Sequence, residues 1–122
     1  MSGGAKRPWP TELRLSPDKA RLTVEYDSGE RFVLTAEYLR VESPSAEVQG
    51  HGPLEKTIVP RKRTVKIRAL EPVGRYAVRI VFDDGHDTGL YTWSYLLELG
   101  KEHETKWAAY VHALMDRGLT RG

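Results

Sequence analysis

The fold is decided by residues 80–96, which read Ile-Val-Phe-Asp-Asp-Gly-His-Asp-Thr-Gly-Leu-Tyr-Thr-Trp-Ser-Tyr-Leu. The apolar residues up to Phe82 predict a β-strand, and the Asp-Gly pair that follows is typical of the tight turns that join antiparallel strands. The strand pattern resumes at Leu90. Because the turn between these two strands contains His86, this histidine is the first candidate for a functional residue.

The composition indicates one small globular domain. The chain has 122 residues, and a chain of this size buries roughly two thirds of its unfolded surface without disulfides. It contains no cysteine, which excludes disulfides, thiolate zinc sites, cysteine nucleophiles and iron–sulfur clusters ligated by this chain alone. The 19 Lys and Arg residues against 17 Asp and Glu residues give a net charge of +2. So small a surplus does not predict a nucleic-acid-binding protein.

Nothing in the sequence predicts insertion into a membrane. No apolar run approaches the roughly 18 residues that a membrane span needs, and the beginning of the chain lacks the apolar stretch of a secretory signal. We therefore expect a cytoplasmic protein with no membrane partner and no nucleic-acid partner. Residues 1–9 combine glycine and proline with little apolar material and predict a flexible tail, whereas residues 10–122 predict a single domain.

A first hairpin is predicted in the N-terminal half. Its apolar positions alternate with polar ones on both sides of a turn at residues 27–29, and they are Leu22, Val24, Tyr26, Phe32 and Leu34. Thr35 is the predicted N-cap of a short helix over residues 36–40, and Ser43, which precedes Pro44, is expected to cap a second helical turn. Residues 49–60 contain glycine and proline without apolar periodicity, so they predict a long loop of a kind that often carries function.

A second hairpin and a helical segment are predicted in the C-terminal half. The hairpin turns at residues 71–74, and its apolar positions are Val65, Ile67, Ala69, Tyr76, Val78, Ile80 and Phe82. After Trp93 the apolar period changes to 3.6, at Leu96, Leu97, Leu99, Trp107, Tyr110, Val111, Leu114 and Met115. Gly100 is expected to break or bend this helix and Gly118 to end it. The predicted class is α+β, a mostly antiparallel sheet built from two hairpins with helices on one side and a C-terminal helical segment.

His86 has two interpretations from the residues alone. Three carboxylates flank it in sequence, at Asp83, Asp84 and Asp87, and such groups tune an imidazole or share a cation. The alternative, which the residues favour, is a structural turn histidine that hydrogen-bonds to its neighbours. A cluster of His86 with His51 and Glu47 has adequate chemistry for zinc or iron, but no local motif such as His-Glu-x-x-His brings ligands together.

The sequence gives only weak support for a hydrolase. Ser43 or Ser45 could act as a nucleophile if it lay beside His86 as the base. However, the sequence contains no Gly-x-Ser-x-Gly nucleophile elbow. We therefore expect a protein that is not an enzyme.

The basic run at residues 61–63 is interpreted as the solvated entry to a strand. Trp93 is a candidate anchor for a protein partner if its ring lies partly exposed beside His86 and Tyr38.

Several segments together resemble a known family. These segments are Tyr38-Leu39-Arg40, residues 43–51 (Ser-Pro-Ser-Ala-Glu-Val-Gln-Gly-His), residues 73–78 (Val-Gly-Arg-Tyr-Ala-Val) and the Asp-Gly-His turn. The chain resembles the gamma-butyrobetaine hydroxylase-like N-terminal domain, a small family whose stand-alone bacterial form has no known function. The resemblance covers nearly all of this chain but only the accessory part of the larger hydroxylases, whose catalytic domain supplies the iron site and the 2-oxoglutarate pocket.

The resemblance also carries an implication about metal. In the hydroxylases that contain this domain, the matching histidine binds a structural zinc ion together with three cysteines. The corresponding positions here are His86 with Ser43, Ser45 and Val48. Neutral hydroxyls are poor zinc ligands and valine is none, so we predict neither a structural zinc ion nor a cofactor.

The family's other domain combinations suggest a role. Related domains are appended to 2-oxoglutarate hydroxylases and to P-loop ATPases of the iron–sulfur cluster carrier class, so the resemblance implies a non-enzymatic interaction or adaptor module with such an ATPase as its partner. The alternative is a metal- or small-ligand-binding protein centred on His86. The predicted binding surface comprises Tyr38, Arg40, Ser43, Ser45, Glu47, His51, Asp84, His86, Tyr91 and Trp93.

Overall fold

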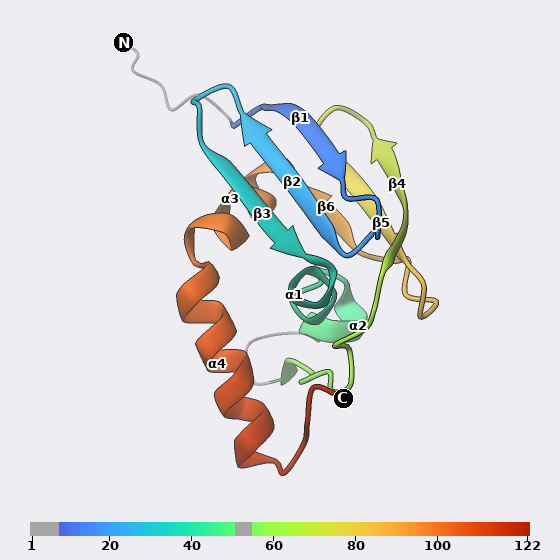
Figure 1. Cartoon of the computed structure of the whole chain (residues 1–122), viewed down its shortest axis with the longest axis vertical. Coiled ribbons are helices and arrows are strands. Elements are labelled where there is room, and N and C mark those ends of the chain that lie inside the picture. The colour runs from blue at the N-terminus through green and yellow to red at the C-terminus, as the bar shows by residue number, and fades with distance from the viewer. Residues whose placement is uncertain (1–7, 51–54) are drawn as a thin grey trace.

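A computed structural model of the chain describes residues 8–50 and 55–122, and these residues form two three-stranded antiparallel sheets and four helices (Figure 1). The first sheet has the order β1-β2-β3, and the second has the order β4-β5-β6. The strands are β1 (Pro10–Leu15), β2 (Arg21–Tyr26), β3 (Arg31–Thr35), β4 (Ile67–Val73), β5 (Ala77–Phe82) and β6 (Leu90–Thr92). The helices are α1 (Ala36–Val41), α2 (Ala46–Gln49), α3 (Trp93–Lys101) and α4 (His103–Asp116). The predicted α+β class is confirmed, and each hairpin gains a third strand to make a sheet of its own.

The first sheet follows from the alternation of apolar residues in its strands. In β2, every second side chain is buried, and the register places Leu22 opposite Leu34 and Val24 opposite Phe32 of β3. The predicted first hairpin is therefore confirmed. Strand β1 was not predicted, although Leu13 and Leu15 alternate with charged residues, because a run this short beginning at a proline is a weak strand signal. Of the tail predicted for residues 1–9, residues 1–7 lie outside the described residues.

The second sheet carries the histidine turn at one end. The inward side chains of β5 are Val78, Ile80 and Phe82, and all three are almost fully buried. They share one core with the inward residues of the first sheet, which lies in front of the second sheet in Figure 1. Tyr76, predicted to point inward, belongs instead to the turn before β5 and is 55% exposed.

Local capping rules explain where the helices begin. The Thr35 hydroxyl accepts a hydrogen bond from the Tyr38 amide at the start of α1, as predicted. The cap of α2 is Ser45, whose hydroxyl accepts from the Glu47 amide. The prediction that Ser43 caps this turn is wrong, because the Ser43 side chain binds elsewhere in the fold.

The C-terminal helical segment divides later than predicted. Helix α3 continues through Gly100 to Lys101, and α4 begins at His103. Gly100 serves close packing, because a Cβ atom there would lie 2.4 Å from the Phe32 ring of β3. Gly118 adopts a φ of +64° just after α4, which is the left-handed geometry expected at a helix end. No helix in the described part of the chain is long and apolar enough to cross a membrane.

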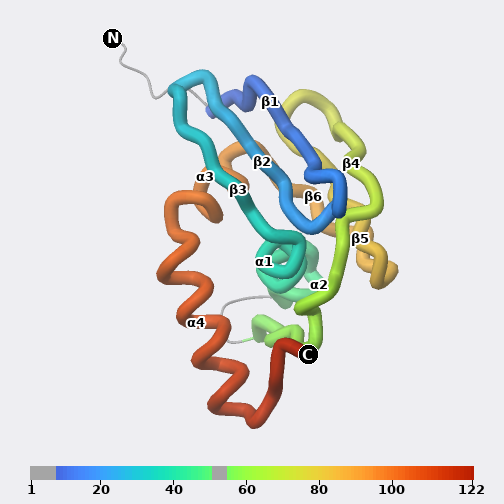
Figure 2. Tube along the Cα trace, viewed as in Figure 1, coloured from blue at the N-terminus to red at the C-terminus, as the bar shows by residue number. Residues whose placement is uncertain are grey.

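The segment after α4 returns to the basic run. The backbone amides of Arg61 and Arg63 donate to the carbonyls of Thr120 and Arg121, and the trace in Figure 2 shows these two segments side by side. The Arg121 guanidinium makes two hydrogen bonds to the buried Glu37 carboxylate. The basic run at residues 61–63 is therefore part of the folded body.

Candidate functional site

The segment after α1 meets the turn between β5 and β6 at a buried serine–histidine pair. The Ser43 Oγ atom lies 2.8 Å from the Nε2 atom of His86, and the direction of this hydrogen bond depends on the imidazole tautomer. Ser43 is 0% exposed and His86 is 6% exposed. The pair therefore forms an interior link between two segments that are separated by 43 residues.

The backbone of the turn is shaped to bring His86 to Ser43. Gly85 has a φ of +92°, a conformation that glycine adopts without strain, and the Phe82 amide then donates to the His86 carbonyl. The close approach of the turn to Ser43 also requires a glycine at position 89, since a Cβ atom there would lie 2.6 Å from the Ser43 Oγ atom. The turn passes so close to Ser43 that only glycine fits at this position.

A charged cluster lies beside the pair and is centred on Asp84. One carboxylate oxygen of Asp84 accepts from the Arg40 Nε atom at 2.8 Å and from the Lys62 ammonium at 2.7 Å. The other oxygen accepts from the His86 amide at 3.1 Å. Burial would raise the pKa of Asp84, but the hydrogen bonds from Lys62, the His86 amide and Arg40 lower this pKa to about 2. The Asp84 carboxylate is therefore ionised at neutral pH and ties α1 to the turn.

A hydroxyl chain continues the network toward the surface. The hydroxyls of Ser45 and Thr88 lie 2.7 Å apart, and Thr88 donates to the Glu47 carboxylate. Glu47 also lies 3.9 Å from the Nδ1 atom of His86, but its side chain is 60% exposed. Burial and the Arg40 charge lower the pKa of His86, against the opposing effect of the nearby carboxylates. The imidazole is therefore neutral at neutral pH.

Ser43, His86 and Glu47 stand in the order of a serine–histidine–acid triad, but the arrangement lacks access. The Ser43 hydroxyl is fully buried and also accepts a hydrogen bond from the Ser45 amide. A nucleophile must reach the substrate carbonyl to react. In this structure, the hydroxyl connects protein groups and is closed off from the solvent.

The residues at the site do not fit the zinc ion that the family resemblance implies. Ser43 and Ser45 offer only neutral hydroxyls, and Val48 is a buried alkyl side chain. The Nε2 atom of His86 is already engaged by Ser43. Within residues 8–50 and 55–122, no group of three or more His, Cys, Asp or Glu side chains is arranged to hold a metal ion. His51, the other imidazole of the alternative metal site, lies outside the described residues.

The predicted binding surface divides into buried and exposed members. Five of its residues are interior, namely Tyr38, Ser43, Ser45, His86 and Tyr91. The two tyrosines donate their hydroxyl protons to backbone carbonyls, from Tyr38 to Leu99 and from Tyr91 to Leu39. Arg40 and Asp84 are mostly covered, and Glu47 is exposed. Half of these side chains therefore support the fold from inside, and a role of the set in binding stays a prediction.

Trp93 and His86 lie at opposite ends of β5. Trp93 begins α3, and its indole nitrogen donates to the Arg75 carbonyl at 2.7 Å. Trp93 lines two grooves, one together with Trp9 and the other together with Tyr76. The tryptophan therefore belongs to the end of the second sheet where β4 turns into β5, whereas His86 lies in the turn between β5 and β6.

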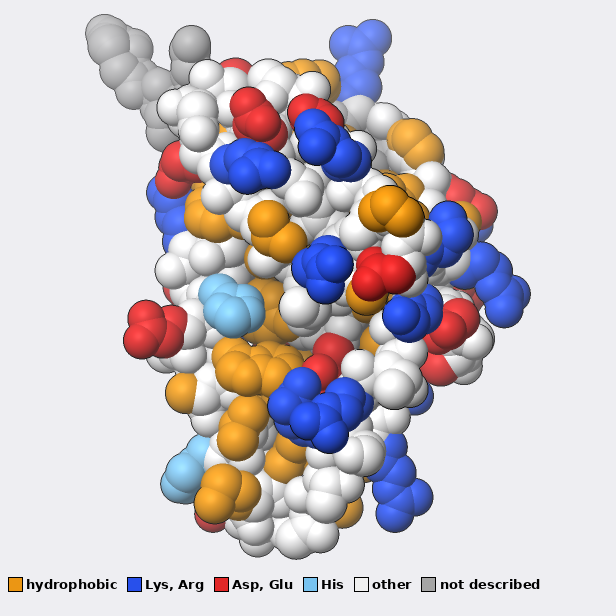
Figure 3. Space-filling model, in the orientation of Figure 1, with side chains coloured by type: hydrophobic (Ala, Val, Ile, Leu, Met, Phe, Trp, Pro, Cys, Tyr) orange, Lys and Arg blue, Asp and Glu red, His pale blue; other side chains and the backbone are white. Residues whose placement is uncertain are grey.

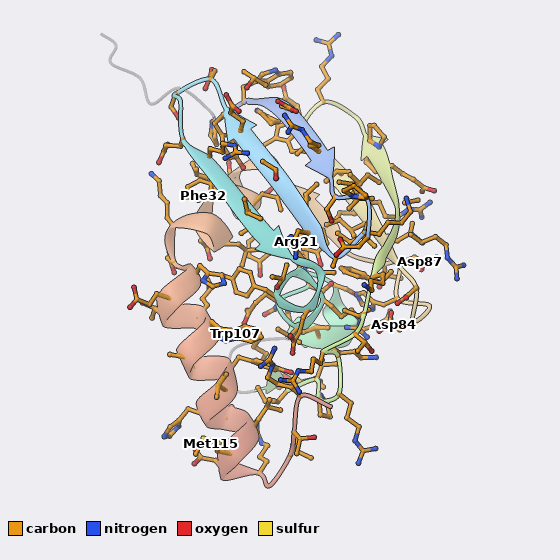
Figure 4. The ribbon with its side chains drawn as sticks, viewed as in Figure 1. Arg21, Phe32, Asp84, Asp87, Trp107 and Met115 are labelled. Atoms are coloured by element: carbon orange, nitrogen blue, oxygen red, sulfur yellow. The ribbon has the colours of Figure 1, made fainter. Side chains whose placement is uncertain are left out.

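Sequence reasoning missed three residues of the network, Lys62, Thr88 and Gly89. Each makes its contact with a segment that is distant in sequence, so no local pattern indicates the contact. The side-chain view shows Asp84 and Asp87 together on the histidine turn, on the opposite side of the molecule from Trp107 of α4 (Figure 4). On the face that Figure 3 shows, acidic and basic side chains are interspersed, without a broad basic patch.

Known proteins resemble the chain in both sequence and structure. The family model described as gamma-butyrobetaine hydroxylase-like, N-terminal, matches residues 13–97. One NMR solution structure is 41% identical, with a TM-score of 0.82 over 95% of this chain and 91% of the other, and a second is 43% identical, with a TM-score of 0.82 over 99% and 90%.

A crystal structure from Acidithiobacillus ferrooxidans extends this similarity. That protein, of unknown function and from the DUF971 family, is 38% identical, with a TM-score of 0.63 over 75% of this chain and 91% of the other. No curated protein matches the sequence. The similar structures therefore support the fold of the whole chain and carry no activity with them.

Proposed function

The chain belongs to the gamma-butyrobetaine hydroxylase-like N-terminal family, and on this premise we propose that it is a non-enzymatic interaction or adaptor module. The observation that carries the proposal is the burial of the Ser43–His86 pair. The side chains with the chemistry of a nucleophile and a base are used to join two segments of the fold. They hold a surface in place, and other side chains present that surface to a partner.

The contact surface of this proposal consists of exposed residues on α2, on the histidine turn and at the start of β6. We define the turn surface as Glu47, Asp83, Asp87 and Leu90, all of which are exposed. It joins three carboxylates to an apolar side chain that is 47% exposed. Complementary charge steers association, and a central apolar contact supplies affinity. The partner therefore presents basic side chains around an apolar residue.

The partner class comes from the family resemblance. Iron–sulfur cluster carrier ATPases and 2-oxoglutarate oxygenases carry related domains, and we propose a protein of one of these two classes as the partner. Because the chain has no cysteine, it assists such a partner without holding a cluster by thiolates. A cytoplasmic location is part of the same proposal.

The test is affinity purification of the tagged protein from its own cells, with mass spectrometry of what is retained. Asp87→Lys reverses one charge of the turn surface. Asp27→Lys is the matched control, because Asp27 is also exposed but lies in the turn between β2 and β3. We expect a protein of the iron–sulfur carrier or oxygenase class to be retained by the wild type and by Asp27→Lys and lost with Asp87→Lys. Equal retention by all three proteins would reject the turn surface, and no specific retention by the wild type would reject the adaptor role.

A further inference from the structure

A cavity outside the histidine site lies between the end of α1, the segment at residues 56–58 and α4. Its volume is about 270 Å³, and its lining residues are Val41, Glu42, Lys56, Thr57, Ile58, Lys106, Ala109 and Tyr110. An engineered apolar cavity of about 150 Å³ binds benzene, so this space is large enough for a small organic molecule. The cavity borders the second, smaller core cluster, to which Val41 and Tyr110 belong.

The wall of the cavity is largely apolar, and its polar groups are mostly occupied. The Tyr110 hydroxyl donates to the Val59 carbonyl, and burial raises the pKa of Tyr110 to about 12, so the phenol stays neutral. The side chain of Glu42 is only 4% exposed, and its carboxylate accepts from the Lys56 ammonium at 2.7 Å. This buried ion pair cancels one negative and one positive charge at the wall.

Lys106 is the other charged residue of the lining, and it forms ion pairs with two glutamates that are not among the lining residues. Its ammonium lies 3.4 Å from a Glu98 oxygen and 3.9 Å from a Glu102 oxygen, and both distances exceed the roughly 2.7–3.2 Å of a good N–H···O hydrogen bond. The side chain of Lys106 is 25% exposed, whereas those of the two glutamates are about half exposed. The cavity therefore combines apolar walls with one cation whose hydrogen-bond donors are not held at close range.

We propose that this cavity binds a small carboxylate with an apolar body. The body packs against Val41, Ile58 and the Tyr110 ring, and the carboxylate accepts hydrogen bonds from the Lys106 ammonium. A cationic ligand is disfavoured, because Glu42, the one carboxylate among the described lining residues, already pairs with Lys56. The site shares no residue with the turn surface, so this proposal stands or falls independently of the adaptor role.

The test uses benzoate as the probe and benzamide as its neutral isostere. Each is titrated into the full chain while the amide and methyl NMR signals are recorded. With benzoate, we expect saturable shifts of the signals of Val41, Ile58 and Ala109. Benzamide should bind at least about tenfold more weakly than benzoate, because it cannot form the charge-assisted hydrogen bond. Equal affinity for the two probes, or no saturable shift at millimolar benzoate, would overturn the proposal.

Two variants assign the charge to Lys106. Lys106→Met keeps the aliphatic stem and removes the ammonium, and we expect it to weaken benzoate binding about tenfold or more. Lys101→Met is the matched control, since Lys101 pairs with Glu30 and does not line the cavity. Unchanged benzoate affinity in a folded Lys106→Met protein, or equal weakening by both variants, would reject the proposed role of Lys106.

Discussion

The two ends of the second sheet differ in what they bury. At the end where β5 turns into β6, Ser43 and His86 are buried and bind each other, and the mostly covered Asp84 carboxylate accepts from the His86 amide. At the end where β4 turns into β5, aromatic side chains are exposed, with Trp9 at 47% and Tyr76 at 55%. Buried polar groups need partners, whereas exposed apolar groups cost little stability. We therefore expect the histidine end to be sensitive to substitution and the aromatic end to be tolerant.

The largest expected effect is that of Asp84→Ala at the histidine end. Removal of the carboxylate leaves Arg40 and Lys62 without their shared partner, and an uncompensated, mostly covered charge is costly. We expect the free energy of unfolding in urea to fall by about 3 kcal/mol. The control is Asp87→Ala on the same turn, where an exposed carboxylate is removed and a change within about 0.5 kcal/mol is expected. Equal effects of the two variants would contradict the assigned role of Asp84.

Gly89→Ala is expected to have the next largest effect. The new methyl group would lie 2.6 Å from the Ser43 Oγ atom and 3.0 Å from the Tyr91 ring, so the turn must move away from α1. Overpacking of this kind costs about 1–3 kcal/mol, measured as the loss of free energy of unfolding. The double variant Ser43→Ala with Gly89→Ala should recover part of this loss, since it removes the closest clashing atom. If the double variant is less stable than additivity predicts, the close contact is not the cause.

The neutral His86 predicts a pH dependence. Its pKa is lowered in the folded protein by burial and by Arg40, whereas an unfolded histidine titrates near about 6.5. The unfolded chain therefore binds a proton more readily, so this contribution is fully present above about pH 6.5 and is lost as pH falls through the folded pKa. Urea unfolding between about pH 7.5 and 5 should show a smaller pH slope for His86→Gln than for the wild type. Parallel slopes would exclude His86 as the group responsible.

Substitutions at the aromatic end should change the free energy of unfolding only slightly. Trp9→Ala removes a ring that is 47% exposed, and we expect the free energy of unfolding to change by less than about 1 kcal/mol. Thermal unfolding measured by circular dichroism suffices for this comparison with Asp84→Ala. A loss as large as that of Asp84→Ala would show that both ends are sensitive to substitution and would remove the contrast between them.

Metal removal is expected to have no effect. The described residues at the histidine end form a hydrogen-bonded network without a metal-binding cluster, so EDTA should leave the melting temperature of the wild type unchanged. The purified protein should also contain no stoichiometric zinc by mass spectrometry of its metals. A melting temperature that EDTA lowers, and zinc restores, would show that His86 binds a metal ion with ligands outside this network.

Local sequence patterns predict much of the fold. The alternation in Leu22–Tyr26, the Thr35 cap and the Asp-Gly turn each depend on residues close in sequence, and each is confirmed. The Ser43 cap failed because a serine hydroxyl has several partners available, and the choice of His86 depends on where the chain folds. The burial of half of the predicted binding residues was likewise not visible in the sequence, since burial is a property of packing.

Most of the strands and helices, and the family, could be read from the sequence, because strand alternation, turn glycines and helix caps are set by neighbouring residues. Only the tertiary structure decided what the chemistry-bearing side chains do. Ser43 meets His86 across 43 residues of sequence, and Lys106 of α4 shares a cavity with Glu42 at the end of α1. Such contacts arise when packing brings distant segments together and desolvates them, and no local pattern encodes that outcome.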